Sequence, residues 1–161
     1  MQRRVLKIIG ILLILCSAFF VANKQIVEIE ESVRSASALR SIMEQIKNMI
    51  ECYSLPIGQI LKKVELSTLK DCGYESEKAP CDLLEFLEKS SVSDTESFEI
   101  FFAFAKDFGK EYRQDELLRC SMFLERIRNR EQKLLKESAK KKKVVLTVSL
   151  CAALAVVILF I

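Results

Sequence analysis

Residues 25–52 have the sequence QIVEIEESVRSASALRSIMEQIKNMIEC, in which apolar side chains recur every three or four positions. This is the spacing of one face of an α-helix, because a helix has 3.6 residues per turn. The stretch contains neither Gly nor Pro, so nothing in it ends a helix early. It therefore predicts a long amphipathic helix, whose apolar face carries Ile29, Val33, Ala36, Leu39, Met43, Ile46 and Ile50.

The next segment predicts helices that turn back along this one. Pro56 suits the first turn of a new helix, since its ring fixes a helical φ and its missing N–H would have no partner there. We therefore predict that Pro56 marks the turn of a helical hairpin. Polar residues with Gly and Pro over 71–80 predict a loop. The apolar residues before and after this loop are Ile57, Ile60, Leu61 and Val64, and then Leu83, Leu84, Phe86 and Leu87.

Residues 94–109 predict a helix with well-marked ends. Asp94 or Thr95 can cap its N-terminus through a side-chain oxygen. Gly109 suits the position after its last turn, because glycine adopts a positive φ without strain. Core packing is the prediction for its aromatic stripe, and a groove for lipid or a partner protein is the alternative. The stripe consists of Phe98, Phe101, Phe102, Ala105 and Phe108.

The last third of the chain predicts one long helix, because no helix breaker occurs between Gly109 and Ile161. With 161 residues, four Gly and two Pro, the chain is expected to form one helix-rich domain. The predicted fold class is therefore all-α, an antiparallel helical bundle. The apolar stripe of the last helix consists of Leu117, Leu118, Cys120, Leu124, Ile127, Leu134 and Leu135.

Both ends of the chain are apolar. Residues 144–161 carry no charge, and 18 helical residues span roughly 27 Å, close to the hydrocarbon thickness of a bilayer. Residues 8–22 are also uncharged, and a span that starts at Val5 reaches the same length if Lys7 extends its ammonium to the headgroups. We therefore predict transmembrane segments at 1–23 and 144–161, on either side of a helical bundle domain at 24–143.

A cleaved signal peptide is the alternative for the N-terminus, because Arg3, Arg4 and Lys7 precede an apolar core. A good small-x-small cleavage site is missing, since Phe20-Val21-Ala22 places a bulky residue where a small one is needed. An uncleaved anchor is therefore favoured.

Lysines beside the second apolar end predict the orientation. Basic residues near a span favour the cytoplasmic side, and they also contact lipid headgroups. Arg3 and Arg4 favour the opposite arrangement, but the larger cluster is expected to decide. No nucleic-acid partner is expected, because 25 Lys and Arg nearly balance 22 Asp and Glu and the surplus lies beside the membrane. The lysine cluster consists of Lys140, Lys141, Lys142 and Lys143.

The residues for catalysis or metal binding are scarce. The chain has no His, the usual general base, and no phosphate-binding loop or nucleophile elbow. A zinc site would need all four thiolates outside the apolar ends, and these form no C-x-x-C pair. We therefore expect no enzymatic activity, no metal and no cofactor, with reduced and mostly buried thiols in a cytoplasmic domain. An exported domain would instead allow a disulfide between Cys72 and Cys81; the four cysteines are Cys52, Cys72, Cys81 and Cys120.

Short motifs spread over nearly the whole chain carry a family resemblance. Residues 7–10 read Lys-Ile-Ile-Gly, residues 39–40 Leu-Arg, and Pro56-Ile57 follows six residues after Ile50. Residues 104–109 read Phe-Ala-Lys-Asp-Phe-Gly, and the chain ends in the apolar segment 143–161. In this combination, and in total length, the chain resembles the stage III sporulation protein AB family of endospore-forming bacteria.

The chain also departs from the pattern of that family. Met49 and Cys52 stand where the family tends to have an acidic residue and Tyr, and Tyr112 and Glu116 where it tends to have Asp and Gln. Glycines that the family favours in the last apolar segment are replaced by two other small residues, Ser149 and Ala153. Their small-xxx-small spacing predicts close approach of another helix.

The resemblance implies a place in the mother-cell membrane around the developing forespore. There the family belongs to a secretion-like complex with an ATPase, the AA protein, and its helical domain is similar to those of the platform proteins of type II secretion and type IV pili. The implied function is docking, in which the cytoplasmic domain binds the ATPase and the spans bind other membrane subunits; a homo-oligomer is compatible with this. The alternatives are a platform subunit unrelated to sporulation, and an exported bitopic protein with a cleaved signal and a C-terminal membrane anchor.

Overall fold

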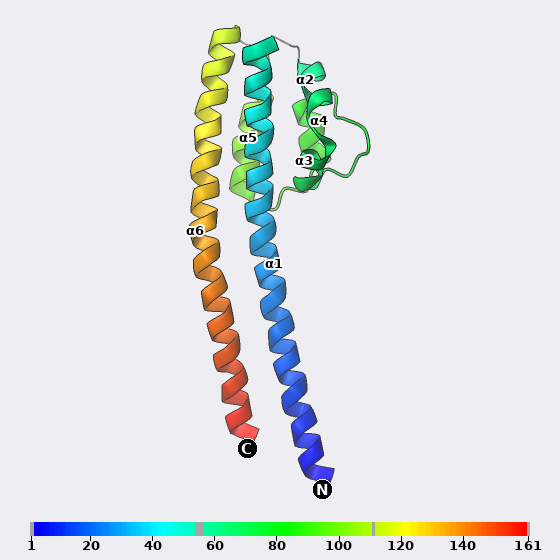
Figure 1. Ribbon diagram of the computed structural model, residues 1–161, viewed down its shortest axis with the longest axis vertical. Helices are drawn as coiled ribbons and strands as arrows, with labels where there is room; N and C mark the ends of the chain where they lie inside the picture. The colour runs from blue at the N-terminus through cyan, green and yellow to red at the C-terminus, as the bar shows by residue number, and fades with distance from the viewer. Residues whose placement is uncertain (1, 54–56, 111, 161) are drawn as a thin grey trace. The chain divides into compact units, whose positions relative to one another are not determined.

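The computed structural model is all-helical over the residues that it describes, 2–53, 57–110 and 112–160 (Figure 1). For residues 2–9, 11–15, 53, 57, 58, 156, 157, 159 and 160 only the backbone is described. The predicted all-α class is confirmed. The helices are α1 (Gln2–Tyr53), α2 (Ile57–Lys63), α3 (Leu66–Asp71), α4 (Leu83–Glu88), α5 (Thr95–Asp107) and α6 (Arg113–Phe160).

The chain divides into two compact units, which we describe separately. One consists of Met1–Glu30 with Lys136–Ile161, and the other of Glu31–Leu135. The long helices α1 and α6 each contribute residues to both units. We call them the terminal unit and the bundle unit.

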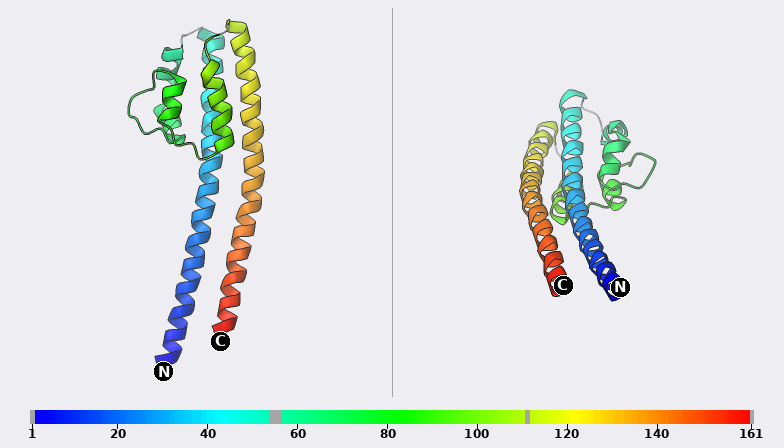
Figure 2. Two further views of the ribbon diagram at one scale, coloured as in Figure 1. Left: turned by 180° about the vertical axis from the view of Figure 1, so that it is seen from behind. Right: turned by 60° about the horizontal axis from the view of Figure 1, so that its bottom comes forward.

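The bundle unit has one hydrophobic core. In Figure 2, α5 lies beside the parts of α1 and α6 that belong to this unit, and the short helices α2, α3 and α4 gather on another side of α1. The predicted apolar face of α1 supplies this core, because Leu39, Met43 and Ile46 are almost completely buried. Largest among the fully buried side chains are Phe86, Phe101, Phe104, Leu39, Ile42, Met43, Ile46, Ile60, Leu61, Leu69 and Ile127.

The segment between α1 and α4 contains two short helices, α2 and α3. The helix breaks after Lys63, and Glu65 adopts an extended conformation with φ −62° and ψ 130° before α3 begins. The break has a packing reason, because it allows Val64, at the break itself, and Leu69, on α3, to enter the same core. Pro56, the predicted turn residue, lies outside the described residues.

The loop predicted at 71–80 begins one residue later, at Cys72, because Asp71 still belongs to α3, and it extends to the start of α4. The Tyr74 hydroxyl donates a hydrogen bond of 2.9 Å to the carbonyl oxygen of Lys78, and an isolated bridge joins Tyr74 to Ser90. Gly73 has φ +73° and lies so close to Ser91 that an added Cβ would be 2.8 Å from its carbonyl oxygen. This position therefore requires glycine, because an L-residue there would be strained and would also clash.

On α4, α5 and α6 the predicted apolar stripe matches the buried face only in part. Phe101 is fully buried and Phe102 is 45% exposed, whereas Phe104, which the predicted stripe omits, is fully buried. On α6, Leu118 and Leu135 are exposed, although their neighbours Cys120, Leu124, Ile127 and Leu134 are buried. Leu84 of α4 is likewise exposed. Each of these exposed residues stands beside a buried or half-buried apolar residue, so helical spacing alone does not decide which of the two enters the core.

The terminal unit consists of the first part of α1 and the last part of α6. Ala22 and Ala153 are nearly buried, while several larger side chains are exposed, among them Phe19 at 70% and Phe20 at 74%. Considering only residues that are described, we find no helix with the length and apolar character needed to cross a membrane.

Candidate docking groove

The contact that positions α5 against α6 is an ion pair between Asp94 and Arg130. Asp94 caps α5, since its Oδ2 accepts hydrogen bonds from the backbone N–H of Ser97 at 2.9 Å and from the Ser97 hydroxyl at 2.6 Å. Arg130 approaches from α6 and donates from Nε to Oδ2 at 2.9 Å and from Nη2 to Oδ1 at 2.6 Å. A two-bond Arg–carboxylate contact fixes orientation as well as distance. It therefore sets the register between the start of α5 and the middle of α6.

The electrostatics of Asp94 follow from this geometry. Burial opposes ionisation of the carboxyl, but the hydrogen bonds from Arg130 and Ser97 outweigh it and lower the pKa of Asp94 from 3.8 to about 2. The side chains of Arg130 and Asp94 are only 13% and 8% exposed. The pair is thus largely shielded from solvent and remains ionised at neutral pH.

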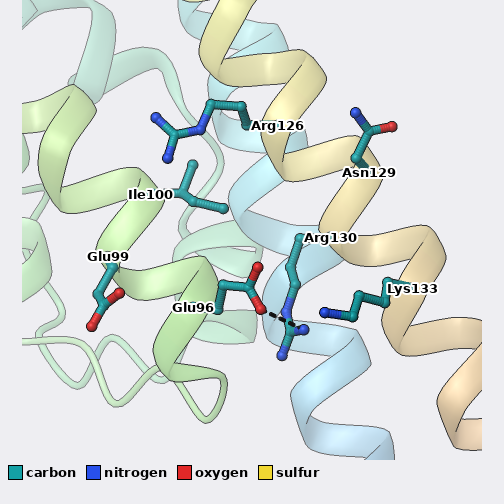
Figure 3. Close-up of a pocket in the computed structure, with 7 residues that line it drawn as sticks. All are labelled: Glu96, Glu99, Ile100, Arg126, Asn129, Arg130 and Lys133. Atoms are coloured by element: carbon teal, nitrogen blue, oxygen red, sulfur yellow. Dashed lines mark ion pairs between the residues drawn. The ribbon is translucent and has the colours of Figure 1, made fainter.

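Arg130 also lines a charged groove between α5 and α6 (Figure 3). Its volume is about 360 Å³, and α5 forms one wall while α6 forms the other. The α5 wall is acidic and the α6 wall is basic, and Arg130 Nη1 lies 2.6 Å from Glu96 Oε2 across the groove. The lining residues are Glu96, Glu99, Ile100, Arg126, Asn129, Arg130 and Lys133.

Part of this charge is available to a partner. Among the described residues, neither Lys133 nor Glu99 has an ion-pair partner, and the guanidinium of Arg126 lies over the ring of Phe123, 5.3 Å from its centroid. Ile100 forms an apolar floor between the two charged walls. Such a groove can bind charged side chains of another protein through ion pairs, with an apolar contact at its base.

A second ion-pair network joins α1 to α6 within the bundle unit. Glu44 Oε1 lies 2.8 Å from Arg128 Nη2 and 3.1 Å from Arg40 Nη1, and Glu131 Oε2 lies 2.8 Å from Arg40 Nε. The hydrogen bond from Arg128 is the largest cause that lowers the pKa of Glu44. These pairs are more exposed than the Asp94–Arg130 pair, so they contribute less to stability.

The predicted site residues lie mostly in the terminal unit. Lys140 and Lys141 line a hollow together with Gln25 and Glu28 of α1, and Lys142 Nζ lies 2.5 Å from Glu30 Oε1. Lys143 is exposed and follows them in α6. The side chains of Arg3 and Arg4 are outside the described part of the chain.

The structure also places the predicted helix-packing residues, Ser149 and Ala153, and the predicted helix-end residue, Gly109. Ser149 and Ala153 line a second hollow of the terminal unit, together with Ala18 and Ala22 of α1. Gly109 has φ +81° and follows Phe108, the C-cap of α5. It therefore occupies the position after the helix where a left-handed conformation is common.

The charged groove was not predicted from the sequence. A signal for it exists, since Arg126, Arg130 and Lys133 are spaced four and three residues apart and therefore share one face of α6. Glu96 and Glu99 share a face of α5 in the same way. What the sequence does not give is the pairing of these two faces, because 36 residues separate Asp94 from Arg130.

Glu116 is a further residue of interest, although in the sequence it stands out only as a departure from a family pattern. It lies in the first turn of α6 and is 4% exposed. Neither of its carboxylate oxygens has a hydrogen-bond partner among the described residues. A buried carboxylate without a partner destabilises a fold, so this position carries a cost that the rest of the bundle unit offsets.

Comparison with known proteins identifies the family. Searches among curated proteins and among solved structures found no match. The family model described as stage III sporulation protein AB matches residues 7–161, which is nearly the whole chain. The chain therefore belongs to the stage III sporulation protein AB family.

Proposed function

We propose that this stage III sporulation protein is a membrane-anchored, non-enzymatic docking subunit, which links a cytoplasmic AA-type ATPase to the other membrane subunits of a secretion-like complex. Membership of the family makes it a stage III sporulation protein. We propose in addition that it has a docking role, that it binds the ATPase, and that it lies in the mother-cell membrane facing the forespore. In this arrangement the bundle unit lies in the cytoplasm.

The observation that carries the docking role is the charged groove between α5 and α6. Its walls are held in fixed register by the Asp94–Arg130 pair, so its charges are positioned before a partner arrives. Preorganised side chains lose little conformational freedom on binding, which favours affinity. Arg126, Lys133 and Glu99 then provide contacts of both signs, which favours a partner with a matching charge pattern.

Membrane anchoring is supported by the distribution of charge. Residues 1–30 and 136–161 contain nine Lys and Arg against three Asp and Glu, whereas residues 31–135 contain 16 against 19. An excess of basic residues beside an uncharged segment favours contact with anionic lipid headgroups on the cytoplasmic side. The uncharged residues 144–161 have the length that a bilayer requires, roughly 27 Å as a helix.

The experiment compares binding of the AA-type ATPase to the purified full-length chain and to two double variants. Arg126→Glu with Lys133→Glu reverses two charges of the groove, and we expect at least a tenfold loss of affinity, since charge reversal at an interface creates repulsion. Lys62→Glu with Lys70→Glu is the matched control, because these exposed lysines lie on α2 and α3, away from the groove. We expect the control to bind like the wild type.

The outcomes of this experiment test the groove and the docking role separately. Loss of binding in the groove variant alone supports docking at this surface. Equal binding by both variants places the ATPase elsewhere and contradicts the groove. Absence of binding by the wild type contradicts the docking role itself.

A further inference from the structure

Two hollows of the terminal unit lie end to end between the same two helices. The first is apolar, about 430 Å³ in volume, and is lined by Cys16, Ala18, Phe19, Ala22, Leu146, Ser149, Leu150 and Ala153. The second, about 460 Å³, is lined by Gln25, Glu28, Ile29, Lys140, Lys141, Val144 and Val145. The spacing of three or four residues between Ala18, Ala22, Gln25 and Ile29 keeps one face of α1 along both hollows.

We propose that these hollows together bind one anionic phospholipid, with an acyl chain against the small residues and the phosphate at Lys140 and Lys141. This inference rests on the proposed membrane anchoring of the chain. It goes further than a general attraction of lysines to a membrane surface, because it assigns a defined groove and one bound molecule.

The shape of the apolar hollow fits an acyl chain. Its walls carry Ala18, Ala22, Ser149 and Ala153, whose short side chains leave space between α1 and α6. Leu146, Leu150 and Phe19 supply apolar surface at its edges. A chain of methylene groups gains from burial in such a groove in proportion to the area removed from water.

The length of the groove also fits. Twelve residues separate Lys141 from Ala153, and at about 1.5 Å per residue this is roughly 18 Å along α6. Half of the hydrocarbon thickness of a bilayer is roughly 15 Å, which is the depth that one acyl chain occupies. A phosphate at Lys141 would therefore place the end of its chain near Ala153.

Charge complementarity selects an anionic headgroup. Lys142 is paired with Glu30, but Lys140 and Lys141 have no ion-pair partner among the described residues. Glu28 also lines the headgroup hollow, so its two lysines leave one net positive charge. A phosphatidylglycerol headgroup, with one negative charge, matches this better than the zwitterionic phosphatidylcholine.

Native mass spectrometry of the full-length chain in mild detergent tests the site directly. Dioleoyl phosphatidylglycerol and dioleoyl phosphatidylcholine are added separately, and bound lipids are counted. We expect one tightly bound phosphatidylglycerol, preferred over phosphatidylcholine by roughly 30-fold on the basis of two lysine contacts. Lys140→Gln with Lys141→Gln should abolish the preference, while Lys24→Gln with Lys136→Gln, which removes the same charge at exposed positions of the terminal unit outside both hollows, should retain it.

A second variant tests the acyl-chain hollow. Ser149→Leu partly fills it and should weaken binding of both lipids, whereas the lysine variant affects phosphatidylglycerol alone. Equal, weak binding of both lipids by the wild type would overturn the proposal. A lipid-free dimer that Ser149→Leu disrupts would also overturn it, because a second copy of the chain would then occupy the groove. Alkaline extraction of membranes distinguishes failure of the lipid site from failure of the proposed membrane anchoring. If the chain resists extraction but binds no lipid selectively, only the lipid site is refuted. If the chain is released, the anchoring is refuted as well.

Discussion

Arg130 of α6 holds both carboxylate oxygens of Asp94, the residue that caps α5, at 2.9 and 2.6 Å. One side chain thus completes a helix cap and also joins two helices. The same guanidinium reaches Glu96 through Nη1 and so forms part of the groove. Stability of the bundle unit and the shape of its candidate docking surface therefore depend on the same residue.

Replacing Arg130 by Ala should lower the free energy of unfolding by about 3–5 kcal/mol, because it leaves the buried Asp94 carboxylate without its charged partner. Arg128→Ala is the matched control, since the Arg128 side chain is 52% exposed and its ion pair with Glu44 should contribute less than about 1 kcal/mol. Denaturant unfolding of the full-length chain in detergent, followed by circular dichroism, measures both. Similar losses in the two variants would contradict a special role for Arg130.

The pair also predicts a dependence of stability on pH. The pKa of Asp94 is lowered from 3.8 to about 2 in the folded state, so the ionised carboxyl stabilises the fold. This contribution is fully present above 3.8 and is lost as the pH falls through 2. The melting temperature of the wild type should exceed that of Asp94→Asn by a constant amount near neutral pH. The difference should shrink as the pH falls below 3.8, and a difference independent of pH would contradict the assignment.

Two glycines with positive φ should respond differently to alanine. At Gly109, where an added Cβ meets nothing within 4 Å, alanine should cost about 1–2 kcal/mol for the left-handed conformation alone. Gly73→Ala should cost clearly more, because its Cβ would also lie 2.8 Å from the carbonyl oxygen of Ser91. Thermal unfolding of both variants gives the comparison. An equal loss would mean that the loop around Gly73 relaxes to accept the methyl group.

Glu116 predicts a stabilising substitution. Glu116→Met should raise the free energy of unfolding by about 1 kcal/mol, because it replaces a buried carboxylate that has no partner among the described residues with an apolar side chain of similar length. Glu125→Met is the control at an exposed position of the same helix and should change stability by less than about 0.5 kcal/mol. A loss of stability in Glu116→Met would show that the carboxylate has a favourable role in the folded chain.

The sequence predicts most of the local structure, because its signals are local. Asp94 followed by an apolar run marks the start of α5, and Gly109 suits the position after its end, as helix termini follow from caps and backbone conformation. Spacing predicts most of the buried face of α1, although the predicted face omits Ile42, which is fully buried beside Met43. The faces of α5 do not, because phenylalanines occur at 98, 101, 102, 104 and 108, and only the neighbouring helices decide which of them is covered.

The candidate groove could not be predicted because it depends on contacts between distant residues. Arg130 and Asp94 are each ordinary charged residues in their own segments, and their importance arises from the packing of α6 against α5. Burial of Glu116 is hidden for the same reason, since a glutamate in the first turn of a helix is normally favourable at the surface. Charge patterns in the sequence indicate helix faces but not which faces meet.

The proposed docking function requires a cytoplasmic bundle unit, because only there can this unit meet a cytoplasmic ATPase. Cys81 is exposed, while burial raises the pKa values of the Cys72 and Cys120 thiols to about 12, so these two should react slowly. A variant with Cys16, Cys52 and Cys151 changed to Ser therefore reports on Cys81 through a membrane-impermeant maleimide. We predict labelling only after the cells are opened. Labelling of intact cells would place the bundle unit outside and contradict the docking function.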